Sequence, residues 1–261
     1  MKHIDIHSHL AWDLDDGIPS IESCKNLLIE AQKDQITKIV ATPHFVCGKH
    51  NENDIEVYQK RINELKEVAS EFSIEIYQGS ELFMNDLLFQ YIQKKLIVPF
   101  ENTHYVLCEF DVRKCYDDDY DLIYDALYEL VIAGYTPILA HVERYFDKKI
   151  DISAIQNLIE IGCVIQVNTS SILNPRNNVV KKNVTTLLEH NLIHVIATDS
   201  HNYKGKRSPN MSDTFTHLSN TYDVSNLEIL FYHNPLAIIS NEQVSTTQFT
   251  KKRQGIRRFF K

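Results

Sequence analysis

Residues 5–17 of the chain read DIHSHLAWDLDDG, and the fold prediction starts from this stretch. We predict a first strand over residues 3–7. Because side chains alternate across a strand, His7 and His9 point to the same side of the backbone. Asp16 follows within a few residues and brings a carboxylate near the two imidazoles. This mixture of nitrogen and oxygen donors suits a divalent metal ion, although a His-x-His pair alone is more often structural.

Short apolar runs alternate along the chain with segments in which apolar residues recur at helical spacing. The predicted strands cover residues 3–7, 36–41, 73–77, 104–108, 136–140, 163–167 and 194–197. Alternation of strands and helices predicts parallel βαβ units with right-handed crossovers. A barrel and an open doubly wound sheet fit this alternation equally well.

The polar residues at the ends of these runs favour the barrel. Histidines and acids lie at or just after the C-terminal ends of six predicted strands: His7, His9, His44, Glu81, Glu109, His141, Asp199 and His201. In a barrel these ends converge on one mouth, whereas an open sheet spreads them along an edge. Each residue alone has an ordinary explanation as a loop acid, a packed histidine or a helix cap. Their shared position predicts a single site.

Composition excludes several classes of protein. A chain of 261 residues with 43% hydrophobic content fits one domain, and its net charge of -8 opposes nucleic-acid binding. We find no apolar run long enough for a membrane helix, no signal peptide and no glycine-rich nucleotide-binding loop. The five cysteines form no C-x-x-C pair, and none has arginine six residues later as in a cysteine phosphatase loop. We therefore expect a cytoplasmic protein with free thiols.

The C-terminal end departs from this acidic average. Residues 251–261 read KKRQGIRRFFK and contain six positive charges and no acid. We predict a basic tail that is either solvated or in weak contact with an anionic membrane surface or an acidic partner.

Six short motifs together resemble a known family. They are DIHSH at 5–9, DDG at 15–17, TPH at 42–44, GSE at 79–81, HVERY at 141–145 and DSHN at 199–202. In this order they resemble the polymerase and histidinol phosphatase (PHP) superfamily, and within it the bacterial manganese-dependent protein-tyrosine phosphatases of capsule and exopolysaccharide loci. The resemblance implies a distorted (β/α)₇ barrel over residues 1–250 with a trinuclear metal centre at the mouth.

The resemblance also implies roles for individual residues. One ion would be held by His7, His9, Glu81 and Asp199. Glu81 would bridge to a second ion held with Glu109 and His141, and a third ion would be held by Asp16, His44 and His201. Arg144 and Arg207 would bind phosphate, with Lys204 and Lys206 as alternatives to Arg207. A salt bridge to Glu143 or Asp147 is the structural alternative for Arg144.

The resemblance implies that two or three Mn²⁺ ions, with iron or zinc as alternatives, generate a bridging hydroxide that attacks a phosphate monoester. The expected substrate is protein phosphotyrosine, in the tyrosine-rich tail of a kinase of polysaccharide synthesis. Alternatives are a small-molecule phosphatase such as histidinol phosphatase, a metal-dependent amidohydrolase, and a non-catalytic module that binds phosphotyrosine. A phosphodiesterase or nuclease fits the acidic composition poorly. Loops 45–53, 110–120 and 202–212 are expected to select the substrate.

Overall fold

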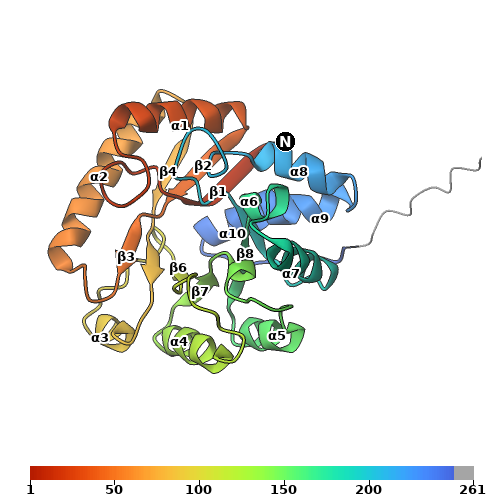
Figure 1. Ribbon diagram of the computed structural model, residues 1–261. Helices are drawn as coiled ribbons and strands as arrows, with labels where there is room; N and C mark the ends of the chain where they lie inside the picture. The colour runs from red at the N-terminus through yellow and green to blue at the C-terminus, as the bar shows by residue number, and fades with distance from the viewer. Residues whose placement is uncertain (250–261) are drawn as a thin grey trace, which may run out of the picture.

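The computed structural model describes residues 1–249, and the predicted basic tail lies outside them (Figure 1). Within this part of the chain, every strand pairing is parallel. The strands are β1 (His3–Ser8), β2 (Ile36–Ala41), β3 (His44–Val46), β4 (Glu75–Gln78), β5 (Glu81–Phe83), β6 (Tyr105–Glu109), β7 (Thr136–Leu139), β8 (Val164–Asn168) and β9 (Val195–Ala197). This confirms the prediction of a parallel α/β fold.

The strands form two sheets that meet at the end of β1. One sheet has the order β1-β2-β4 and the other has the order β3-β5-β6-β7-β8-β9. Ser8 forms a parallel bridge with Ser200, which follows β9. Asp199 N donates to His7 O at 2.9 Å, and His9 N donates to Ser200 O at 2.8 Å. These contacts bring the first and last strands of the chain side by side.

Two of the predicted strands continue further than expected. The second strand is interrupted at Pro43, which lacks a backbone N–H, and then continues as β3. The third is interrupted at Gly79 and continues as β5. Gly79 N donates to Ala41 O at 2.9 Å, and Glu81 N donates to Pro43 O at 3.0 Å, so the two interruptions lie side by side. His44 and Glu81, which we predicted just after the ends of two strands, therefore start the short strands β3 and β5.

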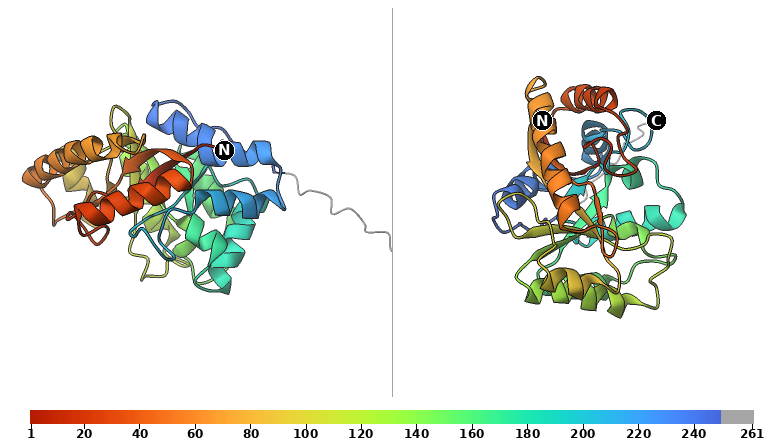
Figure 2. Two further views of the ribbon diagram at one scale, coloured as in Figure 1. Left: turned by 90° about the horizontal axis from the view of Figure 1, so that it is seen from above. Right: turned by 90° about the vertical axis from the view of Figure 1, so that its left-hand side faces the viewer.

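Helices surround the strands (Figure 1). They are α1 (Ile21–Lys33), α2 (Glu52–Ser70), α3 (Leu88–Gln93), α4 (Tyr120–Ile132), the 3₁₀ turn η1 (Val142–Arg144), α5 (Ile152–Glu160), α6 (Thr169–Leu173), α7 (Asn178–Glu189), α8 (Met211–Ser219), α9 (Val224–Glu228), the π-helical turn η2 (Ile229–His233) and α10 (Asn234–Ile239). Helix α8 begins beside the C-terminal end of α1, where Asp34 accepts the backbone N–H groups of Met211 and Ser212 at 2.6 and 2.9 Å. The orange helix α2 lies at the edge of the molecule away from the blue helices (Figure 2).

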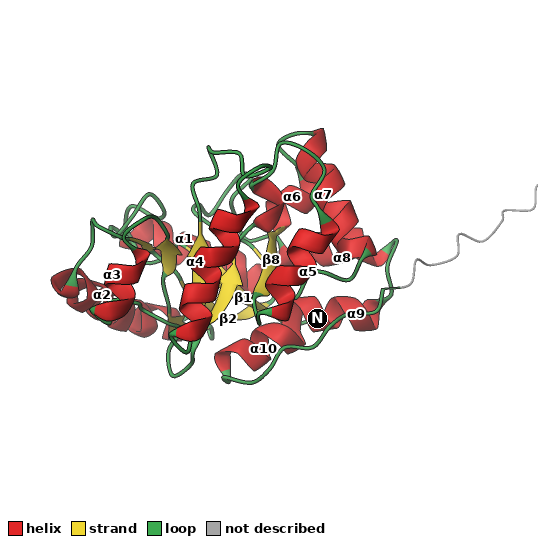
Figure 3. Cartoon of the chain, turned by 90° about the horizontal axis from the view of Figure 1, so that it is seen from below, coloured by secondary structure: helices red, strands yellow, loops and turns green. Residues whose placement is uncertain are grey.

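Apolar periodicity explains how the helices cover the strands. In α1, Cys24, Leu27, Leu28 and Ala31 recur at helical spacing and are all buried, and Ser20 caps the helix by accepting the N–H of Ser23. The strands, yellow in Figure 3, lie inside this layer of helices. Among residues 1–249, no helix combines the length and the apolar character needed to cross a membrane.

Candidate metal centre

Glu81, the first residue of β5, lies at the centre of a cluster of imidazoles. Its Oε1 lies 3.2 Å from His7 Nε2 and 3.1 Å from His141 Nε2. Its Oε2 lies 3.1 Å from His9 Nε2 and 3.2 Å from His44 Nδ1. One buried carboxylate therefore contacts four histidines that are distant in the sequence.

Glu109 and Asp16 lie on either side of His44. Glu109 ends β6, and its Oε1 lies 2.9 Å from His44 Nδ1 while its Oε2 lies 3.5 Å from His141 Nε2. Asp16 Oδ1 lies 3.3 Å from His44 Nε2 and 3.5 Å from His201 Nε2. The imidazole of His44 thus has a carboxylate next to each ring nitrogen.

Asp199 contacts both the imidazole cluster and two arginines. Its Oδ1 lies 3.6 Å from Nε2 of both His7 and His9. The same oxygen accepts a hydrogen bond from Arg207 Nη2 at 2.6 Å, and Oδ2 accepts one from Arg144 Nη1 at 3.3 Å. Every residue predicted for the site therefore lies in one connected cluster.

The structure also bears on the alternatives for the two arginines. Arg144 pairs with Asp199, and Glu143 is instead buried, with Oε1 accepting the backbone N–H of Asn168 at 3.3 Å. Within residues 1–249, Arg144 forms its salt bridge with Asp199, and we find none to Glu143 or Asp147. Lys204 lies over the ring of its neighbour Tyr203, whereas Arg207 contacts Asp199.

An unusual backbone conformation orients two residues of the cluster at the strand ends. His141 and Asp199 adopt the left-handed region, with φ of 35° and 54°. This conformation is unfavourable for residues other than glycine and is concentrated at functional sites. At Gly17, a Cβ would lie 2.4 Å from the carbonyl oxygen of His9, so only glycine lets the acidic loop approach this histidine. The close approach brings Asp16 to the imidazoles.

Sequence reasoning missed two amides that support the cluster from β8. Gln166 Oε1 lies 3.2 Å from His7 Nδ1 and accepts the backbone N–H of His141 at 3.0 Å. Gln166 Nε2 donates to Asn168 Oδ1 at 2.8 Å, and Asn168 Nδ2 donates to Asp199 Oδ2 at 2.7 Å. This contact orients the ring of His7 so that Nε2 faces the cluster. The signal was two amides on one face of an otherwise apolar strand.

Asp15 supports His9 in the same way. Its Oδ2 lies 2.6 Å from His9 Nδ1 and accepts the backbone N–H of His44 at 2.9 Å. Its Oδ1 accepts the N–H of Gly17 at 2.9 Å. Asp15 and Asp16 are adjacent in the sequence but have different contacts. Asp16 faces the cluster, whereas Asp15 contacts Nδ1 of His9, on the side of the ring away from the cluster.

Electrostatics indicate that the cluster attracts cations. Burial disfavours charged imidazoles, yet hydrogen bonds with Asp15 and Glu81 raise the pKa of His9 to about 9. Hydrogen bonds with Glu109 and Glu81 likewise overcome burial and raise the pKa of His141 to about 9. Burial opposes ionisation of Glu81, but attraction to His7 and bonds from the imidazoles hold its pKa well below the usual range. Protons and divalent ions compete for such an excess of carboxylates.

The donor set fits two or three divalent ions. Three groups have ligand atoms within 4.8 Å of one another: His9, Asp16, His44 and His201; His7, His9 and Glu81; and His44, Glu81 and Glu109. The buried Nε2 of His201, which faces Asp16 at 3.5 Å, has no hydrogen-bond partner within the described residues. A buried imidazole nitrogen without a partner is costly unless it binds a ligand such as a metal ion.

Comparison with known proteins identifies the family. A model of the family of capsular polysaccharide synthesis proteins CpsB/CapC matches residues 3–240. The chain belongs to the CpsB/CapC family. Tyrosine-protein phosphatase CpsB of Streptococcus pneumoniae is 30% identical over 248 residues, which cover 92% of this chain and 100% of that protein. Tyrosine-protein phosphatase YwqE of Bacillus subtilis is 27% identical over 203 residues, covering 77% and 78% of the two chains.

A solved structure of this family shares the fold. It comes from work on YwqE of Bacillus subtilis and CpsB of Streptococcus pneumoniae, described as metal-dependent tyrosine phosphatases. The TM-score is 0.79 at 24% identity, covering 95% of this chain and all of the other. CpsB/CapC membership confirms the resemblance that was predicted from the six motifs.

Proposed function

We propose that this protein is a metal-dependent tyrosine-protein phosphatase that releases phosphate from phosphotyrosine in a protein substrate. The observation that carries the proposal is the pair of guanidinium groups, Arg144 and Arg207, that contact Asp199 at the edge of an imidazole and carboxylate cluster. Arginine binds phosphate through parallel N–H donors, and divalent ions suit the neighbouring cluster. The names of the relatives support phosphotyrosine over a small-molecule ester or an amide.

We propose that Mn²⁺ is the native metal, with two or three ions bound and iron or zinc as alternatives. The proposed ligand sets are His7, His9, Glu81 and Asp199; Glu81, Glu109 and His141; and Asp16, His44 and His201. When bound, these ions supply the acidity that yields hydroxide from water near neutral pH and the charge that offsets the phosphate. The overlap of these sets with the donor groups in the structure supports the assignment.

Arg144 and Arg207 stabilise charge on the phosphate oxygens during hydrolysis. Their side chains are 25% and 38% exposed, so a substrate can reach them from solvent, while Asp199 beside them is buried. The leaving group is a phenolate, whose conjugate acid has a pKa of about 10, so it makes a modest demand on a general acid.

The finer architecture is also a proposal. We infer that the two sheets form one distorted (β/α)₇ barrel over residues 1–250, with the metal centre at the C-terminal mouth of the strands. The link between Ser8 and Ser200 supports closure on one side. The side-by-side interruptions at Pro43 and Gly79 support continuity on the other.

We propose the tyrosine-rich tail of a bacterial tyrosine kinase of polysaccharide synthesis as the substrate, in the cytoplasm. The family description, capsular polysaccharide synthesis, supports this partner. The net charge of -8 opposes a nucleic-acid substrate. The basic sequence of residues 251–261 supports weak contact with an anionic membrane surface, where a membrane-associated kinase would be found.

The test is phosphate release from a phosphotyrosine peptide and from histidinol phosphate, with metal-stripped protein before and after addition of Mn²⁺. The double variant His7→Ala, His9→Ala removes two donors to the cluster. His104→Ala is the control, because His104 is exposed and belongs to none of the donor groups. We expect Mn²⁺-dependent release from the peptide by the wild type and the control only.

Other outcomes select the alternatives. Release from histidinol phosphate alone would identify a small-molecule phosphatase. Tight binding of the phosphopeptide without release would identify a non-catalytic binding module. Activity on an amide substrate in place of both esters would identify an amidohydrolase.

A further inference from the structure

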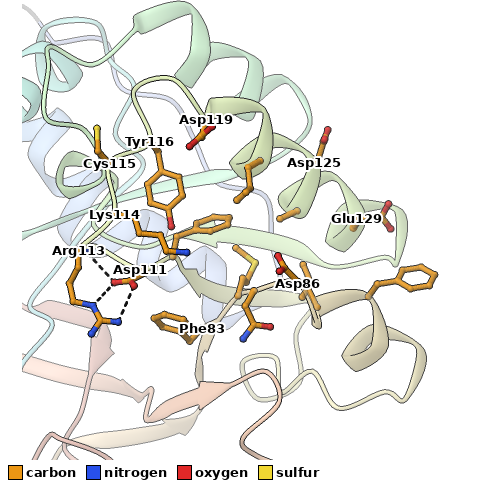
Figure 4. Close-up of a pocket in the computed structure, with 17 residues that line it drawn as sticks. Phe83, Asp86, Asp111, Arg113, Lys114, Cys115, Tyr116, Asp119, Asp125 and Glu129 are labelled. Atoms are coloured by element: carbon orange, nitrogen blue, oxygen red, sulfur yellow. Dashed lines mark hydrogen bonds and ion pairs between the residues drawn. The ribbon is translucent and has the colours of Figure 1, made fainter.

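A pocket of about 500 Å³ lies between α3, α4 and the segment that follows β6 (Figure 4). Its lining includes the aromatic side chains Phe83, Phe89, Phe110 and Tyr116 together with Leu122. Segment 110–119 forms one wall, and this is part of a loop that the sequence marked for substrate selection. None of these residues belongs to the donor groups of the metal centre.

The pocket adjoins the metal centre through two strands. Phe83 and Glu81 are two residues apart on β5, so they face the same side, with Phe83 nearer the C-terminal end of the strand. Phe83 is the register partner of Glu109 on β6, and Phe110 comes directly after Glu109. Phe110 N also donates to Tyr145 OH at 3.1 Å. The lining of the pocket therefore begins at the ends of the two strands that carry Glu81 and Glu109.

The apolar surface of the pocket is open to solvent. The side chains of Phe89 and Leu122 are 55% and 51% exposed, and both line it. Large apolar residues that stay exposed inside a concave site are typical of surfaces that bind a ligand or a peptide. The pocket therefore offers apolar contacts that the metal centre lacks.

Charge is distributed unevenly around the pocket. Arg113 and Lys114 lie at one end, and Asp111 accepts two hydrogen bonds from Arg113, at 2.7 and 2.9 Å. Asp125 and Glu129 lie at the other end, on α4 (Figure 4). These two acids are four residues apart, so they share one face of the helix, and both are exposed. Among residues 1–249, we find no salt bridge from Asp125 or Glu129, whereas Asp111 is paired with Arg113.

The dimensions fit a short extended peptide. Leu122, Asp125, Ala126 and Glu129 line the pocket from one face of α4. At 1.5 Å per residue, the step from Leu122 to Glu129 spans about 10 Å. An extended peptide covers that length with about three residues.

We propose that this pocket binds the substrate segment adjoining the phosphotyrosine, with an apolar side chain against Phe89 and Leu122 and a basic side chain against Asp125 and Glu129. The inference rests on the proposed function and adds the sequence that surrounds the phosphorylated residue. The substrate class is a phosphotyrosine peptide with an apolar residue followed by lysine or arginine. Charge complementarity assigns the basic residue to the α4 end of the pocket.

The experiment compares two phosphotyrosine peptides. In one, the phosphotyrosine is flanked on both sides by leucine and then by lysine, and in the other glutamate replaces lysine. The measured quantity is kcat/KM for each peptide divided by kcat/KM for p-nitrophenyl phosphate, which has no flanking residues. The variants are the charge reversal Asp125→Lys, Glu129→Lys and the matched control Asp121→Lys, an exposed acid of the same helix outside the pocket.

We expect the wild type to prefer the lysine peptide by about tenfold, as two peripheral ion pairs would give. The charge reversal should invert this preference, chiefly through KM, and Asp121→Lys should leave it unchanged. An unchanged preference in the charge-reversal variant would overturn the proposal, as would an equal effect of Asp121→Lys.

A measurement of peptide binding tests the pocket independently of the proposed phosphatase activity. Fluorescence anisotropy of the labelled lysine peptide with Mn²⁺-loaded protein should show about tenfold weaker binding to the charge-reversal variant. Such a loss without any phosphate release by the wild type would support the pocket and refute the phosphatase. Release from p-nitrophenyl phosphate with no binding of either peptide would overturn the pocket. A third outcome would also overturn the proposal. If the wild type self-associates, and the charge reversal abolishes this without changing the peptide kinetics, the pocket binds a second copy of the chain.

Discussion

Buried histidines at the two ends of the parallel strands have pKa values shifted in opposite directions. His3 starts β1 and His194 precedes β9, and burial lowers the pKa of each to about 4. His9 and His141 are also buried but follow the opposite ends of β1 and β7, and there hydrogen bonds to carboxylates outweigh burial and raise each pKa to about 9. The residue type and the burial are shared, so the neighbouring groups decide the charge.

The difference in pKa indicates that histidines at one end of the strands serve metal binding and that those at the other end serve the stability of the fold. At the carboxylate-rich end, the imidazoles compete for protons and divalent ions, which is the property that a metal centre needs. At the other end, His194 is a neutral core residue whose Nδ1 accepts the N–H of Ile165 at 3.1 Å. Substitutions at the first end should affect metal binding and activity, whereas substitutions at the second should affect the pH dependence of folding.

The largest effect is expected from Glu81→Gln. Glu81 contacts four imidazoles, and an amide loses the negative charge that attracts cations to them. We expect Mn²⁺ content to fall and kcat/KM for a phosphotyrosine peptide to drop by more than about 100-fold, beyond the loss typical of groups that only orient ligands. Metal analysis and phosphate release measure this. A Glu81→Gln protein with full metal content and activity would contradict the central role of this carboxylate.

The next effect is expected from Arg144→Lys. Lysine keeps the positive charge but loses the paired donors that match a phosphate, so kcat should fall by about 100-fold. Metal content should stay at the wild-type level, because Arg144 contributes no donor to the metal. A parallel fall in Mn²⁺ content would show that Arg144 acts by holding Asp199 and not by binding phosphate.

A smaller effect is expected from Gln166→Leu. This change removes the acceptor for His7 Nδ1 and the donor to Asn168, so the imidazole loses its orientation. Affinity for Mn²⁺ should fall by about 10- to 100-fold. Gln166→Glu keeps an acceptor for His7 and should retain more affinity than the leucine variant. Equal affinities in titrations of the two variants would exclude a role for this hydrogen bond.

The smallest effect concerns His194 at the opposite end. Its pKa rises from about 4 in the folded chain to its ordinary value of 6.5 on unfolding, so the unfolded chain binds the proton more readily between these values. The stability that comes from this group is therefore complete above pH 6.5 and is lost as the pH falls toward 4. Between pH 7.5 and 5.5 the loss is about 1.4 kcal/mol.

Urea unfolding of the metal-free protein at these two pH values tests this expectation. In His194→Gln, the amide oxygen can still accept the N–H of Ile165 without titrating, so the difference between the two pH values should shrink by that amount. An unchanged difference would assign the acid sensitivity to other groups.

Much of the candidate site could be predicted from the sequence, because its residues stand where strands end. His7 and His9 follow an apolar run, Glu109 ends another, and His141 and Asp199 follow two more. In a barrel such strand ends converge on one mouth, so these positions predicted a single cluster. The positions of strand ends did not reveal that β2 is followed by β3 and β4 by β5. The interruptions at Pro43 and Gly79 pair with each other, and this is a contact between distant segments.

The supporting residues were harder to find. Gln166 and Asn168 lie inside an apolar strand, and only the fold shows that their amides meet His7 and Asp199. Asp15 and Asp16 have the same chemistry and adjacent positions, so only the family resemblance, and not the residue types, pointed to Asp16. That choice follows from the turn at Gly17, which presses the loop against His9.

By itself, the sequence determined the parallel α/β class, the histidines and acids of the candidate site and the family, because these depend on residue periodicity and on short motifs. Only the tertiary structure decided which side chains touch, which carboxylate lies at the centre of the imidazoles, and where a pocket opens beside them. The pocket combines residues of β5, α3, the segment after β6 and α4, and no local pattern in any one of them encodes the others. Contacts between distant segments depend on packing, and packing becomes visible only in the folded chain.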